Sequence, residues 1–368
     1  MFDGTYGKNL KLAVWGGSHD EKIGMTLDGF PAGEAIDADS LRNLLSRRAP
    51  GRNAWSTARK EADEPVFLSG VSDGVTTGGR IEAVIYNTNV RSGDYDNLSD
   101  VPRPSHADYP ARIKYGEEVD LRGGGHFSGR LTAPLTIAGG ICLSALCRRG
   151  IRIGAHIFSL GGVKDTPFDP VLVSEDDFSR VRQADFPTLD ERAGEDMRKI
   201  IESARAAGDS VGGIAECAVT GLPVGLGEHL FDGVENRISA IVFGIPAIKG
   251  IEFGAGFEGV STLCGSRFND PFYTDGKTVR TGTNHAGGIL GGMTDGMPVL
   301  FRVAVKPTPS ISLPQKSVSL SRMENVTLAV KGRHDPCILP RVIPVLEAAA
   351  AVAVTDLFLD AGHLPPVS

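Results

Sequence analysis

Four stretches of this sequence repeat apolar residues with the 3.6-residue period of an α-helix. Two are amphipathic: residues 39–48 begin with capping side chains and end before Pro50, and residues 190–207 end at Gly208. The other two, 132–149 and 339–359, are apolar on most sides. That pattern predicts two helices buried in a core and two that cover it.

Short runs of β-branched and apolar residues lie between these helices, bounded by Gly, Asn and Asp. Such runs predict strands, and they do not alternate regularly with helices as a parallel sheet would require. No strand followed by Gly-x-Gly-x-x-Gly and a helix occurs, which argues against a dinucleotide fold. We expect an α+β protein with antiparallel sheets, in one domain over 1–368, with strands at 11–15, 66–71, 80–86, 213–220 and 299–305.

Composition narrows the class of ligand. The chain has 368 residues, 41% hydrophobic and 23% charged, with a net charge of -7. Nucleic-acid binders are normally basic, so we expect no nucleic-acid partner. The arginines nevertheless gather in Gly- and Pro-rich segments, which fits a small anionic ligand better than a polymer.

The sequence also predicts where the protein works. We find no apolar run of the roughly 18 residues that a bilayer requires and no signal segment, so we expect a cytoplasmic protein without a membrane partner. Five scattered cysteines without CxxC spacing favour reduced thiols over disulfides or zinc, and we expect no metal site. Cys142 and Cys147 fall in an apolar helical pattern, which predicts core packing for both.

The stretch from Arg103 to Arg130 contains the densest candidate chemistry. It reads Arg-Pro-Ser-His106-Ala-Asp and then Arg122-Gly-Gly-Gly-His126-Phe-Ser-Gly-Arg130. Glycines let backbone N–H groups approach a phosphate, and arginines supply charge. The pattern indicates an anion site beside a proton donor, although such a loop is also found as a plain turn.

Other segments carry the same kind of chemistry. His19 follows the first strand on a glycine turn and suits acid–base work, or it is a surface histidine. Arg47 and Arg48 close a helix, where they either cap it or bind an anion. Asp335 precedes a buried helix and either caps it or takes part in catalysis. The remaining two segments are the glycine-rich 287–292 and the proline-stiffened 306–310.

Together these strings resemble the chorismate synthase family over nearly the whole chain. The motifs stand in the family's order. They are Gly16-Gly-Ser-His19, Arg47-Arg-Ala-Pro-Gly51, Arg103-Pro-Ser-His-Ala-Asp108, Arg122-Gly-Gly-Gly125, Gly208-Asp-Ser-Val-Gly-Gly213, Ala247-Ile-Lys-Gly-Ile-Glu-Phe-Gly254, 284–292, 306–310 and 332–337.

The resemblance implies a lyase that converts 5-enolpyruvylshikimate 3-phosphate to chorismate and phosphate. The reaction is an anti-1,4-elimination that requires reduced FMN without net redox change. The resemblance also implies a β-α-β sandwich, with helices between antiparallel sheets, and assembly as a homotetramer. The resemblance leaves open whether NADPH reduces the flavin on the protein or an external reductase does so.

The resemblance also assigns roles by position. His19 would protonate the departing phosphate, His106 would control protonation near the flavin, and Asp335 would assist removal of the substrate C6 proton. Arg47, Arg48 and Arg130 would bind substrate anions. Flavin-contact positions fall on His126, Phe127, Ser128, Ala247, Gly291, Lys306, Pro307, Thr308, Pro309, Ser310 and Arg333.

Several positions depart from the family's usual pattern. The flavin loop reads His126-Phe-Ser-Gly-Arg-Leu131 in place of Arg-Ser-Ser-Ala-Arg-Glu, and Ser105 stands where glycine is usual. Gly17 and Asp20 alter the first motif, and a usual arginine falls on Ala54. The alternative to an active enzyme is therefore a non-catalytic or altered-ligand flavin- or phosphate-binding relative. A phosphate-binding kinase is disfavoured because no GxxxxGK[ST] loop exists.

Overall fold

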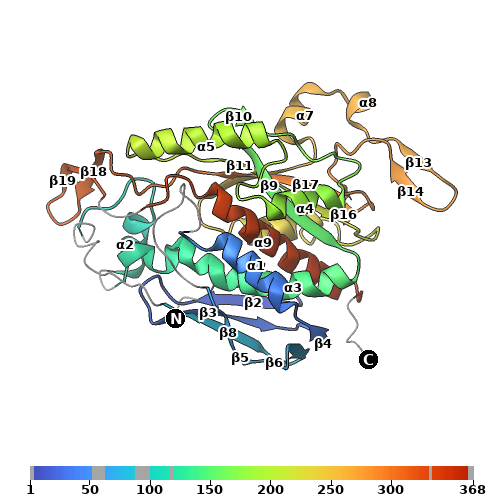
Figure 1. Ribbon diagram of the computed structural model, residues 1–368, viewed down its shortest axis with the longest axis horizontal. Helices are drawn as coiled ribbons and strands as arrows, with labels where there is room; N and C mark the ends of the chain where they lie inside the picture. The colour runs from blue at the N-terminus through green and yellow to red at the C-terminus, as the bar shows by residue number, and fades with distance from the viewer. Residues whose placement is uncertain (1–3, 52–62, 88–99, 117–118, 331–333, 364–368) are drawn as a thin grey trace.

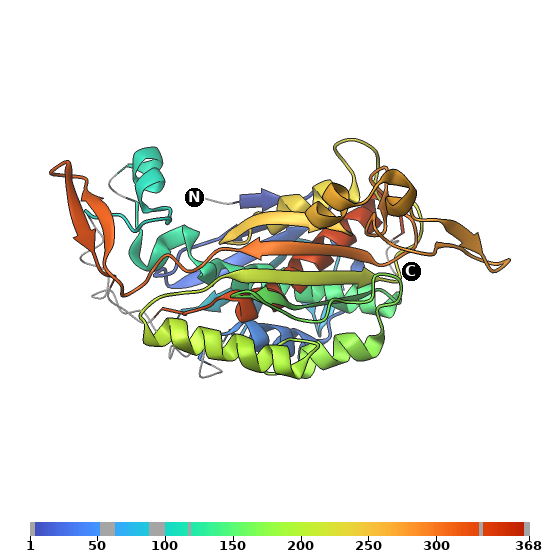
Figure 2. The same cartoon turned by 90° about the horizontal axis from the view of Figure 1, so that it is seen from above.

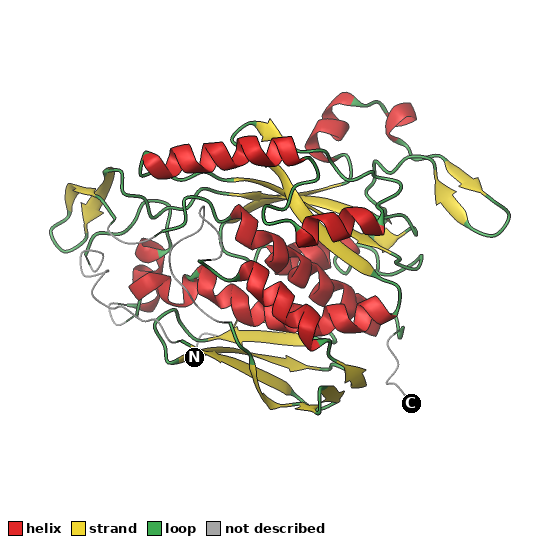
Figure 3. Ribbon diagram, in the orientation of Figure 1, coloured by secondary structure: helices red, strands yellow, loops and turns green. Residues whose placement is uncertain are grey.

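Two antiparallel sheets enclose a layer of helices in this computed structural model, which describes residues 4–51, 63–87, 100–116, 119–330 and 334–363. Figure 1 shows α1, α3 and α9 between the two sheets, and Figure 3 shows the same layers by type of element. Each sheet has an apolar face that must be shielded from water, and the helices between the sheets cover both faces. The predicted α+β sandwich is confirmed.

The first sheet has the order β1-β2-β3-β8-β5. Every pair in it is antiparallel, and Trp15 at the end of β2 lies opposite Gly24. This end of β2 leads into the His19 turn. The strands are β1 (Gly4–Tyr6), β2 (Lys11–Trp15), β3 (Lys22–Asp28), β5 (Val66–Ser69) and β8 (Ile81–Tyr86), beside a small sheet of β4 (Ala32–Ala35), β6 (Val71–Ser72) and β7 (Val75–Thr77).

The second sheet has the order β10-β9-β11-β17-β12 and is also antiparallel. Its β12–β17 register is irregular between Ile248 and Gly250, next to the candidate site. Figure 2 shows α5 running beside this sheet. The elements are β9 (Arg152–Leu160), β10 (Val163–Lys164), β11 (Gly213–Thr220), β12 (Ile248–Phe253) and β17 (Val299–Val305), with α4 (Glu175–Gln183) and α5 (Glu191–Ala206).

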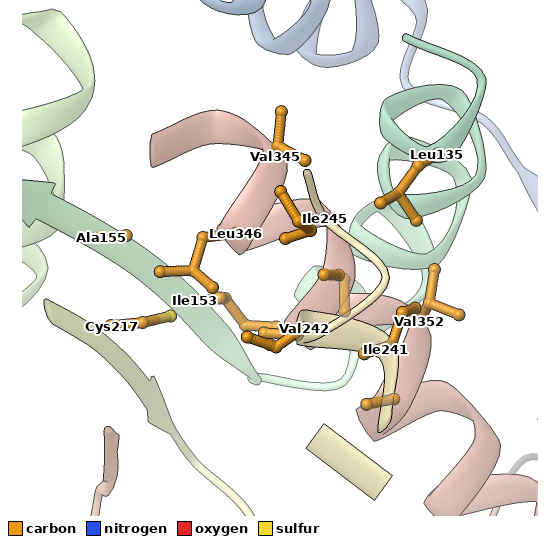
Figure 4. Close-up of a cluster of buried hydrophobic side chains, with 14 of the residues drawn as sticks. Leu135, Ile153, Ala155, Cys217, Ile241, Val242, Ile245, Val345, Leu346 and Val352 are labelled. Atoms are coloured by element: carbon orange, nitrogen blue, oxygen red, sulfur yellow. The ribbon is translucent and has the colours of Figure 1, made fainter. Parts of the chain in front are cut away.

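The central helices pack closely because small residues face each other. A Cβ placed on Gly139 of α3 would lie 2.3 Å from the Cα of Ala348 on α9, so the two backbones are nearly in contact. Figure 4 shows Leu135, Ile153 and Val352 among the buried apolar side chains between α3, α9 and β9. The helices of this layer are α1 (Ala38–Arg48), α3 (Thr132–Arg148), α6 (Val234–Val242) and α9 (Leu339–Asp360).

The predicted helices and strands are present, with small changes at their ends. The run predicted at 66–71 is divided between β5 and β6 at Gly70, whose φ is +79°. Periodicity did not find the helix that follows the His106 motif, because it is short and half exposed. The elements beyond the two sheets and the core are α2 (Asp108–Tyr115), α7 (Gly256–Thr262), α8 (Gly265–Phe268) and the pairs β13 (Phe272–Thr274) with β14 (Val279–Thr281), β15 (Ile289–Leu290) with β16 (Met293–Thr294), and β18 (Gln315–Ser319) with β19 (Glu324–Leu328).

Two expectations need correction. Residues 122–148 and 339–360 are long and apolar enough to cross a membrane by length and composition, contrary to the expectation of no such run. Their most apolar windows are 83% and 94% buried in the fold, so core packing accounts for that composition. Cys142 is buried as predicted, but Cys147 is exposed because it lies in the last turn of α3, beyond the core.

Candidate active site

A cavity of about 570 Å³ lies where the chemistry-bearing segments meet. That volume is within the range of small-molecule sites. Its walls come from the end of α1, the loop before α2, the glycine loop before α3, the 243–248 segment, the 306–310 segment and the start of α9. The predicted site residues that line it are Arg48, His106, His126, Phe127, Ser128, Arg130, Ala247, Lys306, Thr308, Pro309, Ser310 and Asp335.

The triple-glycine loop separates the two predicted catalytic histidines. Gly123 and Gly124 have φ of 58° and 93°, which is the left-handed region that glycine tolerates. A Cβ on Gly123 would lie 2.5 Å from Cε1 of His19, and one on Gly124 would lie 3.6 Å from Nε2 of His106. At Gly123 the loop needs glycine to let the His19 ring approach, whereas at Gly124 the contact with His106 is an ordinary one and the positive φ is what favours glycine. His106 lines the cavity, whereas His19 lies beside the loop and both its ring nitrogens are buried.

A single buried carboxylate joins two of the arginines that line the cavity, Arg48 and Arg130. Asp63 accepts hydrogen bonds from Nε of Arg48 at 2.9 Å and from Nη1 of Arg130, and its side chain is 1% exposed. Burial is the largest effect on Arg48 and lowers its pKa. Arg341 and Arg130 lower it further and Asp63 opposes them, so the resulting pKa is about 10. Arg48 is still cationic at neutral pH, and one carboxylate serves two guanidinium groups.

Other cations of the cavity are also held in place. Asp335 is buried and accepts a hydrogen bond from Nη1 of Arg341, while Lys306 donates to the carbonyl oxygen of Ser105. Burial lowers the pKa of Lys306, and the positive charge of Lys249 adds to that effect. Among the described residues, five cations (Arg48, Arg103, Arg130, Lys306 and Arg341) line the cavity, and three carboxylates (Asp63, Asp108 and Asp335) pair with the four arginines. The excess of positive charge over these residues suits an anionic ligand.

His106 belongs to a second buried network. Arg103 donates to both carboxylate oxygens of Asp108 at 2.7 Å, and Nδ1 of His106 lies 2.7 Å from Oδ1 of the same carboxylate. Burial alone would raise the pKa of Asp108, but the hydrogen bonds from Arg103 and His106 hold it well below its usual range. Arg103 also donates from Nη1 to Oγ of Ser310 at 3.2 Å, which ties the network to the 306–310 segment.

The altered loop forms a ring cluster at the cavity mouth. The rings of His126 and Phe127 lie 4.1 Å apart, and Tyr115 meets His126 edge-on at 5.4 Å. Burial lowers the pKa of His126, although Asp20 partly opposes this. His126 is therefore mostly neutral at pH 7, so aromatic contact rather than charge is its contribution to the site.

Four predicted site residues do not line the cavity, and a fifth cannot be placed. Arg47 turns to Glu347 and donates at 2.6 and 2.9 Å, so its predicted substrate role finds no support in the described structure. Gly291 lies in the turn between β15 and β16, away from the cavity wall. Pro307 lies between the lining residues Lys306 and Thr308, and His19 lies against the lining residue Gly123. Arg333 and Ala54 lie outside the described residues.

Sequence reasoning missed Asp63 and gave no role to Asp108. Asp108 had a signal, since it follows His106 by two residues in a motif that begins with Arg103. Asp63 had none, because its partners Arg48 and Arg130 are 15 and 67 residues away and meet it through the fold.

Comparison with known proteins decides the family. A family model described as chorismate synthase matches residues 10–359. Chorismate synthases of Lancefieldella parvula and Thermococcus kodakarensis are each 45% identical to the chain, covering 97% and 96% of it and 96% and 97% of their own lengths. A crystal structure of chorismate synthase superposes with a TM-score of 0.74 at 25% identity, covering 96% of this chain and 93% of that one.

The chain belongs to the chorismate synthase family. It is a lyase of the shikimate pathway by membership, and it has the fold of the solved chorismate synthase. Its departures from the family pattern now have places in the structure. Arg130 keeps a cation in the altered loop through Asp63, and Ser105 takes a φ of 59° at the position where the family's glycine is usual.

Proposed function

We propose that this protein removes phosphate from 5-enolpyruvylshikimate 3-phosphate to form chorismate, by an anti-1,4-elimination that requires reduced FMN. The substrate carries a phosphate and two carboxylates, and in the part of the chain that the structure describes more cations than carboxylates lie at the cavity. This excess of positive charge among the described residues is the observation that carries the proposal, because an anionic ligand would balance it.

One hydroxyl on the cavity wall that is unpartnered among the described residues supports the proposal of a bound flavin. Oγ1 of Thr308 is buried and has no hydrogen-bond partner among the described residues, although it lines the cavity. A ligand that accepts or donates there would satisfy it. The residues that would hold FMN are His126, Phe127, Ser128, Ala247, Lys306, Thr308, Pro309 and Ser310, with Gly291, Pro307 and Arg333 proposed from the resemblance alone. When bound, reduced FMN supplies an electron-rich ring beside the substrate without net oxidation.

Three residues would handle protons in this reaction. The C–O bond to phosphate breaks, the C6 proton leaves, and a second ring double bond forms. We assign protonation of the departing phosphate to His19, control of protonation near the flavin to His106, and assistance with the C6 proton to Asp335. His106 and Asp335 both line the cavity, and His19 lies behind the glycine loop. Arg48 and Arg130 would bind the substrate anions.

An anaerobic assay tests the function. Purified protein, reduced FMN and substrate are mixed, and phosphate and chorismate are measured. The proposal expects the two products in equal amounts. Substrate binding without phosphate release would instead identify a non-catalytic or altered-ligand relative. Replacing His106 with alanine should lower turnover by about 10²–10⁴-fold, the contribution of a lost general acid or base; unchanged turnover would remove its role.

The source of reducing equivalents is a separate question. We propose that NADPH reduces the flavin either on this protein or through an external reductase. Bleaching of the oxidised flavin absorbance by NADPH, with the purified protein alone, would assign the reduction to this chain. Bleaching that requires added reductase would assign it elsewhere.

We propose a cytoplasmic homotetramer in which residues 1–368 form one domain. Large aromatic side chains are exposed: Phe231 is 86%, Phe257 74% and Phe272 64% accessible. Association sites are built from contiguous exposed apolar surface, and these side chains are the ones we propose to contribute to the contacts between subunits. Light scattering that gives four chain masses would support the tetramer, and a monomer mass would overturn it.

A single cooperative unfolding transition is expected if residues 1–368 form one domain. Cell fractionation would test the proposed cytoplasmic location of the protein.

A further inference from the structure

The Asp108 carboxylate receives two donors on one oxygen. Nη2 of Arg103 and Nδ1 of His106 each lie 2.7 Å from Oδ1 of Asp108, and the two nitrogens lie 3.1 Å apart. Asp108 and Arg103 are nearly inaccessible, with side chains 5% and 4% exposed. The three groups therefore form a compact triangle in which the carboxylate and the guanidinium are buried and the imidazole reaches the cavity.

This triangle fixes the position of one proton. A guanidinium can donate only, and an ionised carboxylate can accept only. If Nδ1 of His106 accepted from Arg103, its lone pair would face Oδ1 of Asp108 at 2.7 Å without a hydrogen between them. The arrangement without such repulsion has a proton on Nδ1 of His106, donated to Asp108, with Arg103 donating to the same oxygen.

The other ring nitrogen is then the one available for chemistry. Nε2 of His106 points along the glycine loop, 3.6 Å from where a Cβ of Gly124 would be, and His106 lines the cavity. In the neutral ring a proton on Nδ1 leaves Nε2 as an acceptor. Asp108 lies at the start of α2 and does not itself line the cavity, so it acts through the histidine.

We propose that Asp108 is a positioning residue that holds His106 in the Nδ1–H tautomer and so keeps Nε2 available to the ligand. This rests on the proposed proton-handling role of His106. Arg103 completes the device, because it orients the carboxylate and donates to Oγ of Ser310. The same carboxylate thereby fixes the imidazole relative to the 306–310 segment, which also lines the cavity.

The tautomer can be measured without activity. The full chain is labelled with ¹⁵N-histidine, His106 is assigned by the signals lost in His106→Gln, and long-range ¹H–¹⁵N spectra are recorded where the imidazole carries a single proton. The wild type should show the proton on Nδ1. In Asp108→Asn the amide N–H₂ can donate to Nδ1, so the proton should move to Nε2 in a large share of molecules. The matched control is Asp28→Asn, which breaks the exposed Asp28–Arg80 pair and should leave the His106 spectrum unchanged.

Turnover gives the second readout. In a Ser-His-Asp triad, the Asp-to-Asn change leaves the geometry intact and lowers kcat by about 10⁴ through the wrong tautomer. We expect Asp108→Asn to lower kcat by about 10²–10⁴-fold with a KM within a few-fold of wild type, and Asp28→Asn to change neither. A wild-type proton on Nε2, or an Nδ1 proton retained in Asp108→Asn, would overturn the proposal. A protein that releases no phosphate fails the proposed function, while the wild-type tautomer still tests Asp108.

Discussion

Arg47 and Arg48 are adjacent in the chain, but their guanidinium groups lie in separate places. Arg47 donates twice to Glu347 inside the helical layer, whereas Arg48 donates to Asp63 and lines the cavity. Consecutive helical residues point about 100° apart, so one turn of α1 serves both the core and the site. Substitution of Arg47 should therefore affect stability, and substitution of Arg48 should affect substrate binding, although the two residues look equivalent in the sequence.

Arg47→Met should cost stability. Arg47 and Glu347 have side chains 10% and 2% exposed, so the change leaves a buried carboxylate without its cation. Losing one partner of a buried pair costs about 3–5 kcal/mol. Urea denaturation should show that loss, whereas Arg80→Met, in the exposed pair with Asp28, should lose less than about 1 kcal/mol. Equal small losses would contradict the buried-pair account.

The α1 example also shows what could be predicted from the sequence. Periodicity predicted α1, α3, α5 and α9, and short runs of β-branched and apolar residues predicted β2, β11 and β17, because these signals are local. The sequence motifs contain most of the residues that line the cavity. Asp63, Glu347 and the direction of Arg47 could not be predicted, since each depends on contacts between residues far apart in the chain.

Ser105→Gly should stabilise the protein. Ser105 has a φ of 59°, a left-handed conformation that costs a non-glycine residue roughly 1–2 kcal/mol, and glycine's larger unfolded-state entropy offsets part of the gain. We expect a net increase of about 0.5–1 kcal/mol in the free energy of unfolding. Ser105→Ala keeps the Cβ and should gain nothing. A glycine variant that is no more stable than the alanine variant would show that backbone strain is not the relevant cost.

Gly139→Ala should destabilise the core. The added Cβ would lie 2.3 Å from both the Cα and the Cβ of Ala348, so α3 and α9 must move apart. Overpacking of this kind costs about 1–3 kcal/mol. Thermal or urea unfolding measures it, with Gly265→Ala as the control, because a Cβ there meets nothing within 4 Å. Comparable stability of the two variants would contradict the close approach of α3 and α9.

His156 should make stability depend on pH. Burial lowers its pKa, but hydrogen bonds to Asp165 and Glu216, at 2.8 and 3.0 Å, outweigh burial and raise the pKa above 6.5. A raised folded-state pKa adds stability that is complete below the unfolded pKa and is lost as pH rises through the folded pKa. The free energy of unfolding should therefore fall as pH rises above about 6.5.

Substitution isolates this contribution. His156→Gln should flatten the fall in unfolding free energy above pH 6.5, whereas His229→Gln should leave it in place, because His229 is exposed. Unfolding free energies measured across pH 6–9 give the comparison. A wild-type slope that persists in His156→Gln would assign the pH dependence to other groups.

Anaerobic phosphate release by Arg48→Gln is the measurement that decides whether the cavity beside Asp63 is the active site. Hydrogen bonds to charged groups contribute about 1.5–3 kcal/mol, which corresponds to a rise in KM of about 10–100-fold. Asp63 stays paired with Arg130 in this variant, so the fold should survive. Arg80→Gln, on the exposed Asp28 pair, should keep the wild-type KM. A wild-type KM in Arg48→Gln would show that the substrate binds elsewhere.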